Sequence, residues 1–264
     1  KQEIDQLVNF PYNDLVKQGR VEKTADKTQK VINLWKFFGI NSFSALTQTE
    51  AVAYRRNYGD GVNQGSLAAW LRCGELDAAQ QLTLNVYSES DLRNLLPRIR
   101  TMTQMLEKDW WLTLQQALSD VGVGLVAAQP LTGTQAYGAT RWIGKNPIIQ
   151  LSNRGKDADK MWFTLFHELG HIILHGKKDQ FISFNKSIRS PQEDEADAFA
   201  AKTLLPDSEY RSFLIQGDFS ELSIKRFAQL QGVHTGTVVG RLKKEGVLSY
   251  AAYQHLHAKL IIKE

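Results

Sequence analysis

Cysteine is almost absent from this sequence, which has a single one, Cys73, among its 264 residues. One cysteine cannot form an internal disulfide framework, and this fits a reducing compartment such as the cytosol. Long apolar runs are also absent: no stretch of about 18 apolar residues predicts a membrane helix, and the first residues lack the apolar core of a signal peptide. We therefore expect a cytoplasmic protein without a membrane partner.

An excess of charge of one sign is lacking as well. The formal net charge is +4, from 32 basic and 28 acidic residues, and the basic residues are scattered along the chain. Such a charge permits contact with nucleic acid but does not require it. With 42% hydrophobic residues, the chain can bury a sizeable core in one or two domains.

The hydrophobic pattern predicts helices, then a small sheet, then helices again. Helical spacing predicts helices at residues 31–38, 66–81, 90–100, 106–120, 157–175 and 192–205. Apolar runs rich in β-branched residues predict strands at 121–128, 137–143 and 147–152. Pro97 is an expected interruption, a loop separates the last two helices, and the tail is expected to be helical from Ser220. We expect an α+β fold with a helical region at 1–105, a core at 106–215 and a helical tail at 216–264.

The strongest motif is the segment His167-Glu168-Leu169-Gly170-His171. Residues four apart share one helix face, so His167 and His171 can bind one metal ion together. Glu168 can reach a water on that ion without being a ligand. This is the arrangement of zinc peptidases, in which zinc lowers the pKa of water to about 7 and the glutamate takes its proton. The alternative is a pair of packed core histidines.

A catalytic zinc needs a third protein ligand and one open position. The following helix carries Glu193 and Asp197 four apart, and we expect Glu193 to be the ligand and Asp197 to hydrogen-bond a ligand histidine. Glu195, on a different face, is the competing ligand. His175 continues the histidine spacing, but a fourth ligand would close the open position, so a histidine favoured by the helix dipole is preferred there. Zinc suits this donor set, and manganese or iron would also bind it.

A peptide substrate is expected to bind as an extended strand beside the sheet, by main-chain pairing. The segment Gly138-Ala139-Thr140-Arg141-Trp142 is the candidate edge, because its small residues let another backbone approach closely. The alternative is that they belong to a core hairpin strand. Tyr137 and His234 are weaker candidates for stabilising an oxyanion.

The stretches FTLFHELGHIILHG and EDEADAFAAKTLLP closely resemble the ImmA/IrrE family of metallo-endopeptidases. In that family the HExxH helix is followed by one that reads E-x-x-x-(N/D)-x-F-A-A. This maps onto Glu193, Asp197 and Phe199-Ala200-Ala201, and it supports Glu193 over Glu195. The stretches VINLWKFFGI, LAAWLRCGELDA and GVHTGTVVGRLKKEGVLSY extend the resemblance over nearly the whole chain. It implies a zincin-like metallopeptidase core, with a small mixed sheet beside the HExxH helix and the glutamate-bearing helix.

The resemblance also implies partners. In this subgroup an XRE-type helix-turn-helix DNA-binding domain usually precedes the helical region, and we expect the chain to lack that domain ahead of Lys1. Characterised relatives cleave XRE-type repressors after a stress signal, so the first hypothesis is a zinc endopeptidase that acts on such a protein. The second is a transcriptional regulator or an antitoxin encoded with a toxin, whose peptidase-like domain is a sensor or interaction module with little turnover.

The tail has the outline of a helix-turn-helix over residues 227–242, with Gly232-Val233 at the turn. Arg241, Lys243 and Lys244 lie nearby, so DNA contact is one interpretation. Packing of these helices against the peptidase core is the other, and the resemblance favours it.

Overall fold

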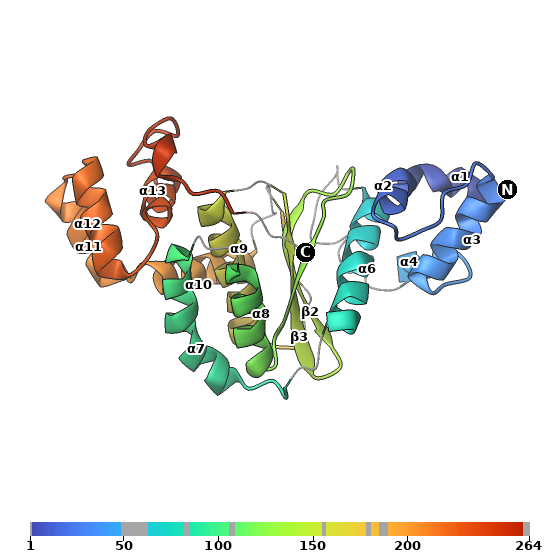
Figure 1. Ribbon diagram of the computed structural model, residues 1–264, viewed down its shortest axis with the longest axis horizontal. Coiled ribbons are helices and arrows are strands. Elements are labelled where there is room, and N and C mark those ends of the chain that lie inside the picture. Colours follow the sequence, from blue (N-terminus) through green and yellow to red (C-terminus); the bar gives the residue numbers. More distant parts are fainter. Residues whose placement is uncertain are drawn as a thin grey trace.

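The structure is a computed structural model that describes residues 2–48, 63–81, 85–105, 109–154, 157–177, 181–184 and 190–260. Within these ranges the strands form one four-stranded sheet, and helices cover both of its faces (Figure 1). The α+β class expected from the sequence is confirmed. None of the helices in the described ranges combines the length and the apolar composition needed to cross a bilayer.

The sheet has the strand order β1-β3-β2-β4. β1 (Gly124–Ala128) pairs in parallel with β3 (Asn146–Ser152), and β3 pairs antiparallel with β2 (Ala136–Ile143). Their hairpin turns at Gly144, whose φ of 62° is one that glycine adopts readily. β4 (Phe181–Phe184) lies antiparallel on the other side of β2. The sequence predicts the first three strands, whereas β4 lies in a segment that it predicts as loop.

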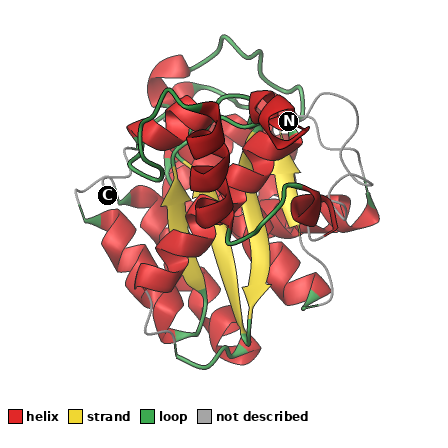
Figure 2. Cartoon of the chain, turned by 90° about the vertical axis from the view of Figure 1, so that its right-hand side faces the viewer, coloured by secondary structure: helices red, strands yellow, loops and turns green. Residues whose placement is uncertain are grey.

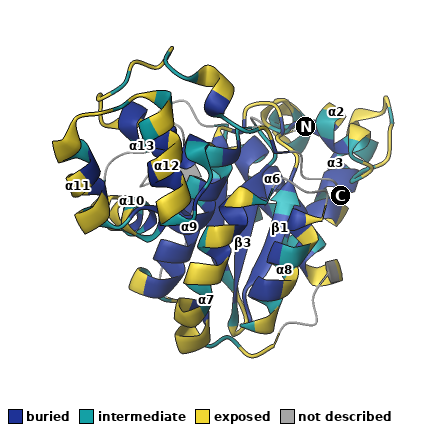
Figure 3. Ribbon diagram, turned by 60° about the vertical axis from the view of Figure 1, so that its left-hand side comes forward, coloured by how far each residue is buried: buried dark blue, intermediate teal, exposed yellow. Residues whose placement is uncertain are grey.

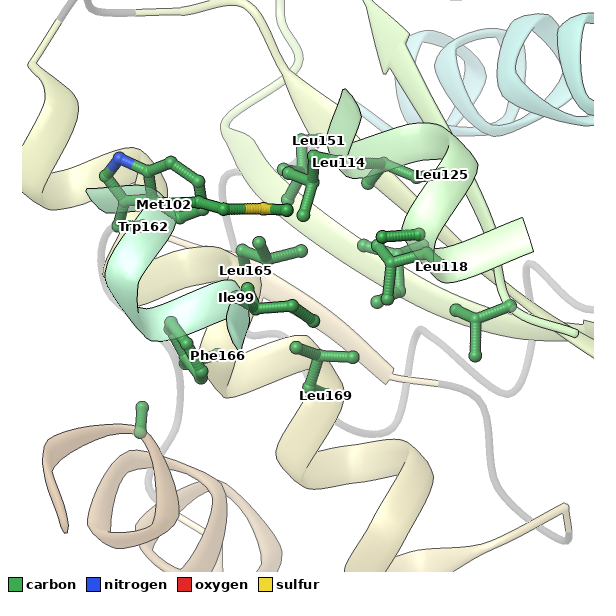
Figure 4. Close-up of a cluster of buried hydrophobic side chains, with 14 of the residues drawn as sticks. Ile99, Met102, Leu114, Leu118, Leu125, Leu151, Trp162, Leu165, Phe166 and Leu169 are labelled. Carbon is green, nitrogen blue, oxygen red and sulfur yellow. The ribbon is translucent and has the colours of Figure 1, made fainter. Parts of the chain in front are cut away.

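α8 (Trp110–Asp120) and α9 (Ala158–His175) cover one face of the sheet. Outside them pack α7 (Glu89–Thr101) and α10 (Pro191–Leu204). Figure 4 shows the core between these helices and the sheet, in which fully buried side chains meet: Ile99, Leu114, Leu118, Leu125, Leu151, Trp162, Leu165, Phe166 and Leu169. Each such side chain stabilises the fold by roughly 1.5–3 kcal/mol. α9 therefore lies deep in the molecule, with dark blue residues along most of its length in Figure 3.

α6 (Gln64–Gln81) covers the opposite face of the sheet. The N-terminal elements beyond it, which lie in front of the sheet in Figure 2, are α1 (Gln2–Asp5), η1 (Gln6–Asn9), α2 (Tyr12–Lys17), α3 (Lys27–Phe38) and α4 (Ser44–Gln48). Successive side chains of β3 point to opposite faces of the sheet. Ile149 packs in the core with α9, whereas Gln150 donates from Nε2 to the Trp70 carbonyl on α6 at 2.7 Å. Helices from the first 105 residues thus lie on both sides of the sheet.

The helices after α10 have a hydrophobic cluster of their own. They are α11 (Asp207–Gln216), α12 (Glu221–Gln231) and α13 (Thr235–Lys244). α12 and α13 are joined at Gly232 and show the helix-turn-helix outline. However, α13 packs against α9, and its Gly236 and Gly240 lie close to Leu256 and Asp159, respectively. These helices therefore pack against the core, which is one of the two interpretations that the sequence leaves open.

Two helix predictions are wrong. α7 continues through Pro97 to Thr101. Pro97 is exposed, so water can hydrogen-bond to the carbonyl that loses its N–H partner, while Leu92 and Ile99 hold the helix to the core. The tail is not helical throughout: the described residues after Lys244 form turns and only the short 3-10 helix η3 (Gln254–Leu256).

Candidate metal centre

Three side chains from α9 and α10 meet at one point in the interior. Nε2 of His167 lies 3.0 Å from Nε2 of His171, and the two carboxylate oxygens of Glu193 lie 3.4 and 3.3 Å from these nitrogens, respectively. All three residues are buried, and one ligand atom from each lies within 4.8 Å of the others. The structure thus brings together the three residues that the sequence predicts as ligands.

The spacing of these atoms fits a metal ion. A tetrahedral zinc with ligands at about 2.0–2.1 Å places neighbouring ligand atoms about 3.3 Å apart. The distances of 3.0, 3.3 and 3.4 Å lie near that value, with a different oxygen of Glu193 facing each histidine nitrogen. Two imidazoles and a carboxylate also form a donor set that suits zinc and leaves a fourth position for water or substrate.

Close packing of α9 on α10 brings Glu193 to the histidines. A Cβ on Gly170 would lie 3.1 Å from the Phe199 ring and 3.3 Å from Cα of Ala196, so glycine permits this approach. At the start of α10, Ser190 is the N-cap and its Oγ accepts a hydrogen bond from the Glu193 backbone N–H at 3.3 Å. The cap orients the first turn of α10, from which the Glu193 side chain extends.

Asp197 and Lys244 support one of the two histidines. Nδ1–H of His167 donates to Oδ1 of Asp197 at 2.9 Å, which leaves Nε2 of His167 directed into the cluster. Oδ2 of Asp197 accepts from Nζ of Lys244 at 3.0 Å, and this ammonium also lies over the Phe163 ring, 4.6 Å from its centroid. The end of α13 is thereby connected to the metal centre, a contact that the sequence does not predict.

Glu195 and His175, the two alternative ligands, lie outside the cluster. Oε2 of Glu195 contacts Nε2 of His175 at 2.9 Å, and Nδ1 of His175 contacts Nδ1 of His171 at 3.0 Å. Both ring nitrogens of His175 are therefore engaged away from the point where the three ligand atoms meet. Glu195 reaches a histidine, but it is the third histidine of α9.

Glu168 is fully buried against β2. Its Oε2 accepts a hydrogen bond from Oγ1 of Thr140 at 2.7 Å. Its Oε1 lies over Gly138, where a Cβ would approach that oxygen to 2.3 Å. Gly138 and Thr140 thus seat the carboxylate, a role that the sequence does not predict for them.

The expectation that Gly138, Ala139 and Thr140 form a sheet edge is wrong. All three pair with β3 on one side and with β4 on the other, so β2 is an inner strand. The described edge beside α9 is β4, which has only β2 as a partner within the described residues. A peptide cannot pair with the main chain of β2 without displacing β4.

The two oxyanion candidates have different surroundings. His234 is the N-cap of α13, and its Nδ1 accepts a hydrogen bond from the Gly236 backbone N–H at 3.0 Å. Tyr137 lines a small hollow together with Thr164, which is one helical turn before Glu168. Tyr137 is therefore the candidate that lies near the helix face that carries Thr164 and Glu168, and His234 has a structural contact of its own.

The buried charges interact strongly in the metal-free chain. Burial alone would lower the pKa of His167, but hydrogen bonds to Asp197 and Glu193 raise it to about 10. Burial would raise the pKa of Glu193, but hydrogen bonds from the histidines lower it to about 2. For His171, burial and the nearby His167 lower the pKa to about 4. The metal-free centre at neutral pH thus holds an imidazolium, a neutral imidazole and a carboxylate.

Metal binding is therefore expected to release one proton, from His167. Since the ion needs the unprotonated Nε2, and the pKa of His167 is raised to about 10, zinc affinity should rise about tenfold per pH unit from pH 6 to 9. Competition titrations at several pH values, with calorimetry in buffers of different ionisation enthalpy, measure the slope and the proton count. An affinity that does not change with pH would contradict this arrangement of charges.

Comparison with known families gives one match. The model of the Peptidase_M78 family, described as the IrrE N-terminal-like domain, matches residues 124–243. The match begins at β1 and ends within α13, so it includes the three ligand candidates and Glu168. A search of curated proteins found no match to the chain. The resemblance to the ImmA/IrrE family stated from the sequence is confirmed over residues 124–243, and its extension to the rest of the chain stays a prediction.

Proposed function

Residues 124–243 form an IrrE N-terminal-like domain of a metallopeptidase family, and from this we propose that the chain is a zinc-dependent endopeptidase that cuts a protein substrate. One observation carries the proposal: the buried side chains of His167, His171 and Glu193 bring their ligand atoms close enough to hold one zinc ion, and Glu168 lies between the two histidines on the same helix. When bound, zinc supplies a Lewis acid that lowers the pKa of water and polarises a carbonyl group.

Glu168 is the general base of the proposed reaction. It accepts a proton from the water that attacks the peptide carbon, and it returns the proton to the amine that leaves when the C–N bond breaks. Thr140 holds Oε2 of this carboxylate at 2.7 Å, so the base is kept in one orientation before substrate arrives. His167 and His171 each direct Nε2 to the metal position, and Glu193 directs its carboxylate there. Asp197 fixes the orientation of the His167 ring.

The proposed substrate is a protein segment in extended form. Among the described residues β4 is the edge strand beside α9, so a peptide that adds a strand there would lie next to the metal centre. The resemblance to the ImmA/IrrE family supports an XRE-type transcriptional repressor as the substrate class, in the regulation of a stress response or a mobile element.

The test is chelator-sensitive proteolysis. The zinc-loaded chain is incubated with the repressors and other proteins encoded beside its gene, with and without a chelator, and products are identified by mass spectrometry. We expect cleavage that stops on chelation and resumes on adding zinc. If the chain binds zinc but cuts none of these proteins, the alternative holds, in which the domain is a sensor or an interaction module of a regulator or antitoxin.

Replacement of Gly138 by alanine is expected to slow the proposed reaction. The new Cβ would lie 2.3 Å from Oε1 of Glu168 and 2.8 Å from Cγ2 of Thr164, so the carboxylate has to move. Since a displacement of about 1 Å can cost about 10²-fold in rate, we expect a loss of that order with zinc affinity unchanged. Steady-state kinetics and a zinc titration measure the two effects.

Gly144→Ala is the matched control for that variant. It places the same methyl group in the hairpin of the same strand, where nothing lies within 4 Å, although its φ of 62° is strained for alanine. We expect lower stability but an unchanged rate for the folded fraction. Equal rates for both variants would show that Gly138 does not seat Glu168.

A further inference from the structure

His171 and His167 have different hydrogen-bond partners at Nδ1. His167 donates directly to a carboxylate, whereas Nδ1 of His171 faces another imidazole, that of His175, at 3.0 Å. Nε2 of His175 in turn faces Oε2 of Glu195 at 2.9 Å. The three side chains form a continuous row that leads from the metal centre to the surface, where the Glu195 side chain is 61% exposed.

The positions of the protons in this row follow from its two ends. To offer the lone pair of Nε2 to a metal ion, a neutral His171 carries its proton on Nδ1. That proton points at Nδ1 of His175, which must accept it and therefore be unprotonated. The proton of His175 is then on Nε2, where it is donated to the Glu195 carboxylate. Each of the two links thus has one donor and one acceptor.

The ring of Phe181 holds the imidazole rings of this row in place. It stacks on the His171 ring with centroids 3.9 Å apart and planes 8° apart, and it lies 5.0 Å from the His175 ring. Phe181 is the first residue of β4 and is buried. Both imidazoles are therefore restrained by α9 and by packing against the edge strand, which limits ring rotation.

We propose that His175, held by Glu195, is a positioning residue that fixes the Nδ1-protonated tautomer of His171 and so directs Nε2 of His171 to the metal. The proposal rests on the proposed zinc centre and goes beyond it, since the row ends at a surface carboxylate. Carboxylates that act on a ligand histidine strengthen metal binding about 10–100-fold. Through a neutral imidazole we expect the lower end of that range.

The first test compares two variants of the whole chain. His175→Leu removes the acceptor for Nδ1–H of His171, and we expect zinc affinity to fall about tenfold in competition with a chromophoric chelator. His175→Asn keeps an oxygen near the position of Nδ1, and we expect it to restore the affinity to within about threefold of the parent chain. If His175 had a purely structural role, the zinc affinities of the two variants would instead change in step with their thermal stabilities.

The second test reads the tautomers in the parent chain, and so does not depend on how the variants fold. Nitrogen-15 NMR of the zinc-loaded chain, labelled at histidine, should show His175 protonated at Nε2 and His171 at Nδ1. Protonation of His175 at Nδ1, or a His175→Leu variant that binds zinc as tightly as the parent, would overturn the proposal while the zinc centre stands. Failure of the parent chain to bind zinc would overturn the proposed function as well.

Discussion

Replacing Glu168 by glutamine is expected to lower the rate of peptide hydrolysis by about 10³-fold while the chain still binds zinc. Glutamine has the shape of glutamate but cannot accept a proton from water, so it removes the general base alone. The proposed ligand atoms belong to His167, His171 and Glu193, none of which the substitution touches. Thr140 can still donate to the amide oxygen, so the side chain keeps its place against β2.

Asp194→Asn is the control for that substitution. Asp194 is an exposed carboxylate on the first turn of α10, next to Glu193, and its conversion to an amide changes the charge without reaching the cluster. We expect its rate and zinc affinity to match those of the parent chain. Turnover of a defined peptide and zinc content after dialysis are measured for all three proteins. A Glu168→Gln variant that retains the parent rate would exclude Glu168 as the base.

The parts of the site that the sequence predicts are those that depend on local spacing. His167 and His171 share a face because α9 is a regular helix over both, and Glu193 and Asp197 share a face for the same reason on α10. The first three strands follow from runs of β-branched residues with turn signals at their ends. A sequence pattern that spans one or two helical turns needs no knowledge of the rest of the chain.

The parts that it does not predict depend on residues distant in the chain. β4 has four residues, too few for a pattern, and it exists as a strand because β2 offers it an edge about 45 positions earlier. Gly138 and Thr140 face Glu168 because of the register in which β2 packs under α9, and a slip by one residue would turn both to the α6 side. The small size of these residues indicates that another group packs closely against them, but it does not identify which side chain that is.

For Glu195, helical spacing predicts the face on which the residue lies but not the residue that it contacts. The sequence places it on a different face from Glu193, which agrees with its absence from the ligand cluster. Its actual contact is His175, 20 residues earlier. That contact is set by how α10 crosses α9 at Gly170, and helix crossing depends on side chains along both helices.

Removal of the carboxylate of Glu193 is expected to lower zinc affinity by about 10²-fold. Zinc sites with four protein ligands bind with roughly 10–16 kcal/mol, which is about 3 kcal/mol for each ligand, or about two powers of ten. In Glu193→Ala the two histidines remain, but the only carboxylate that faces both Nε2 atoms among the described residues is lost. Competition titration and metal content after dialysis measure the change.

Glu195→Ala is the matched comparison, because it removes a carboxylate two positions later on the same helix. It leaves the ligand cluster intact and shortens only the row that supports His171, so we expect a loss of a few-fold rather than about 10²-fold. The ratio of the two effects distinguishes a ligand from a supporting residue more sharply than either variant alone. Equal losses would contradict the assignment of Glu193 as the third ligand, since an exposed carboxylate would then matter as much as the buried one that contacts both histidines.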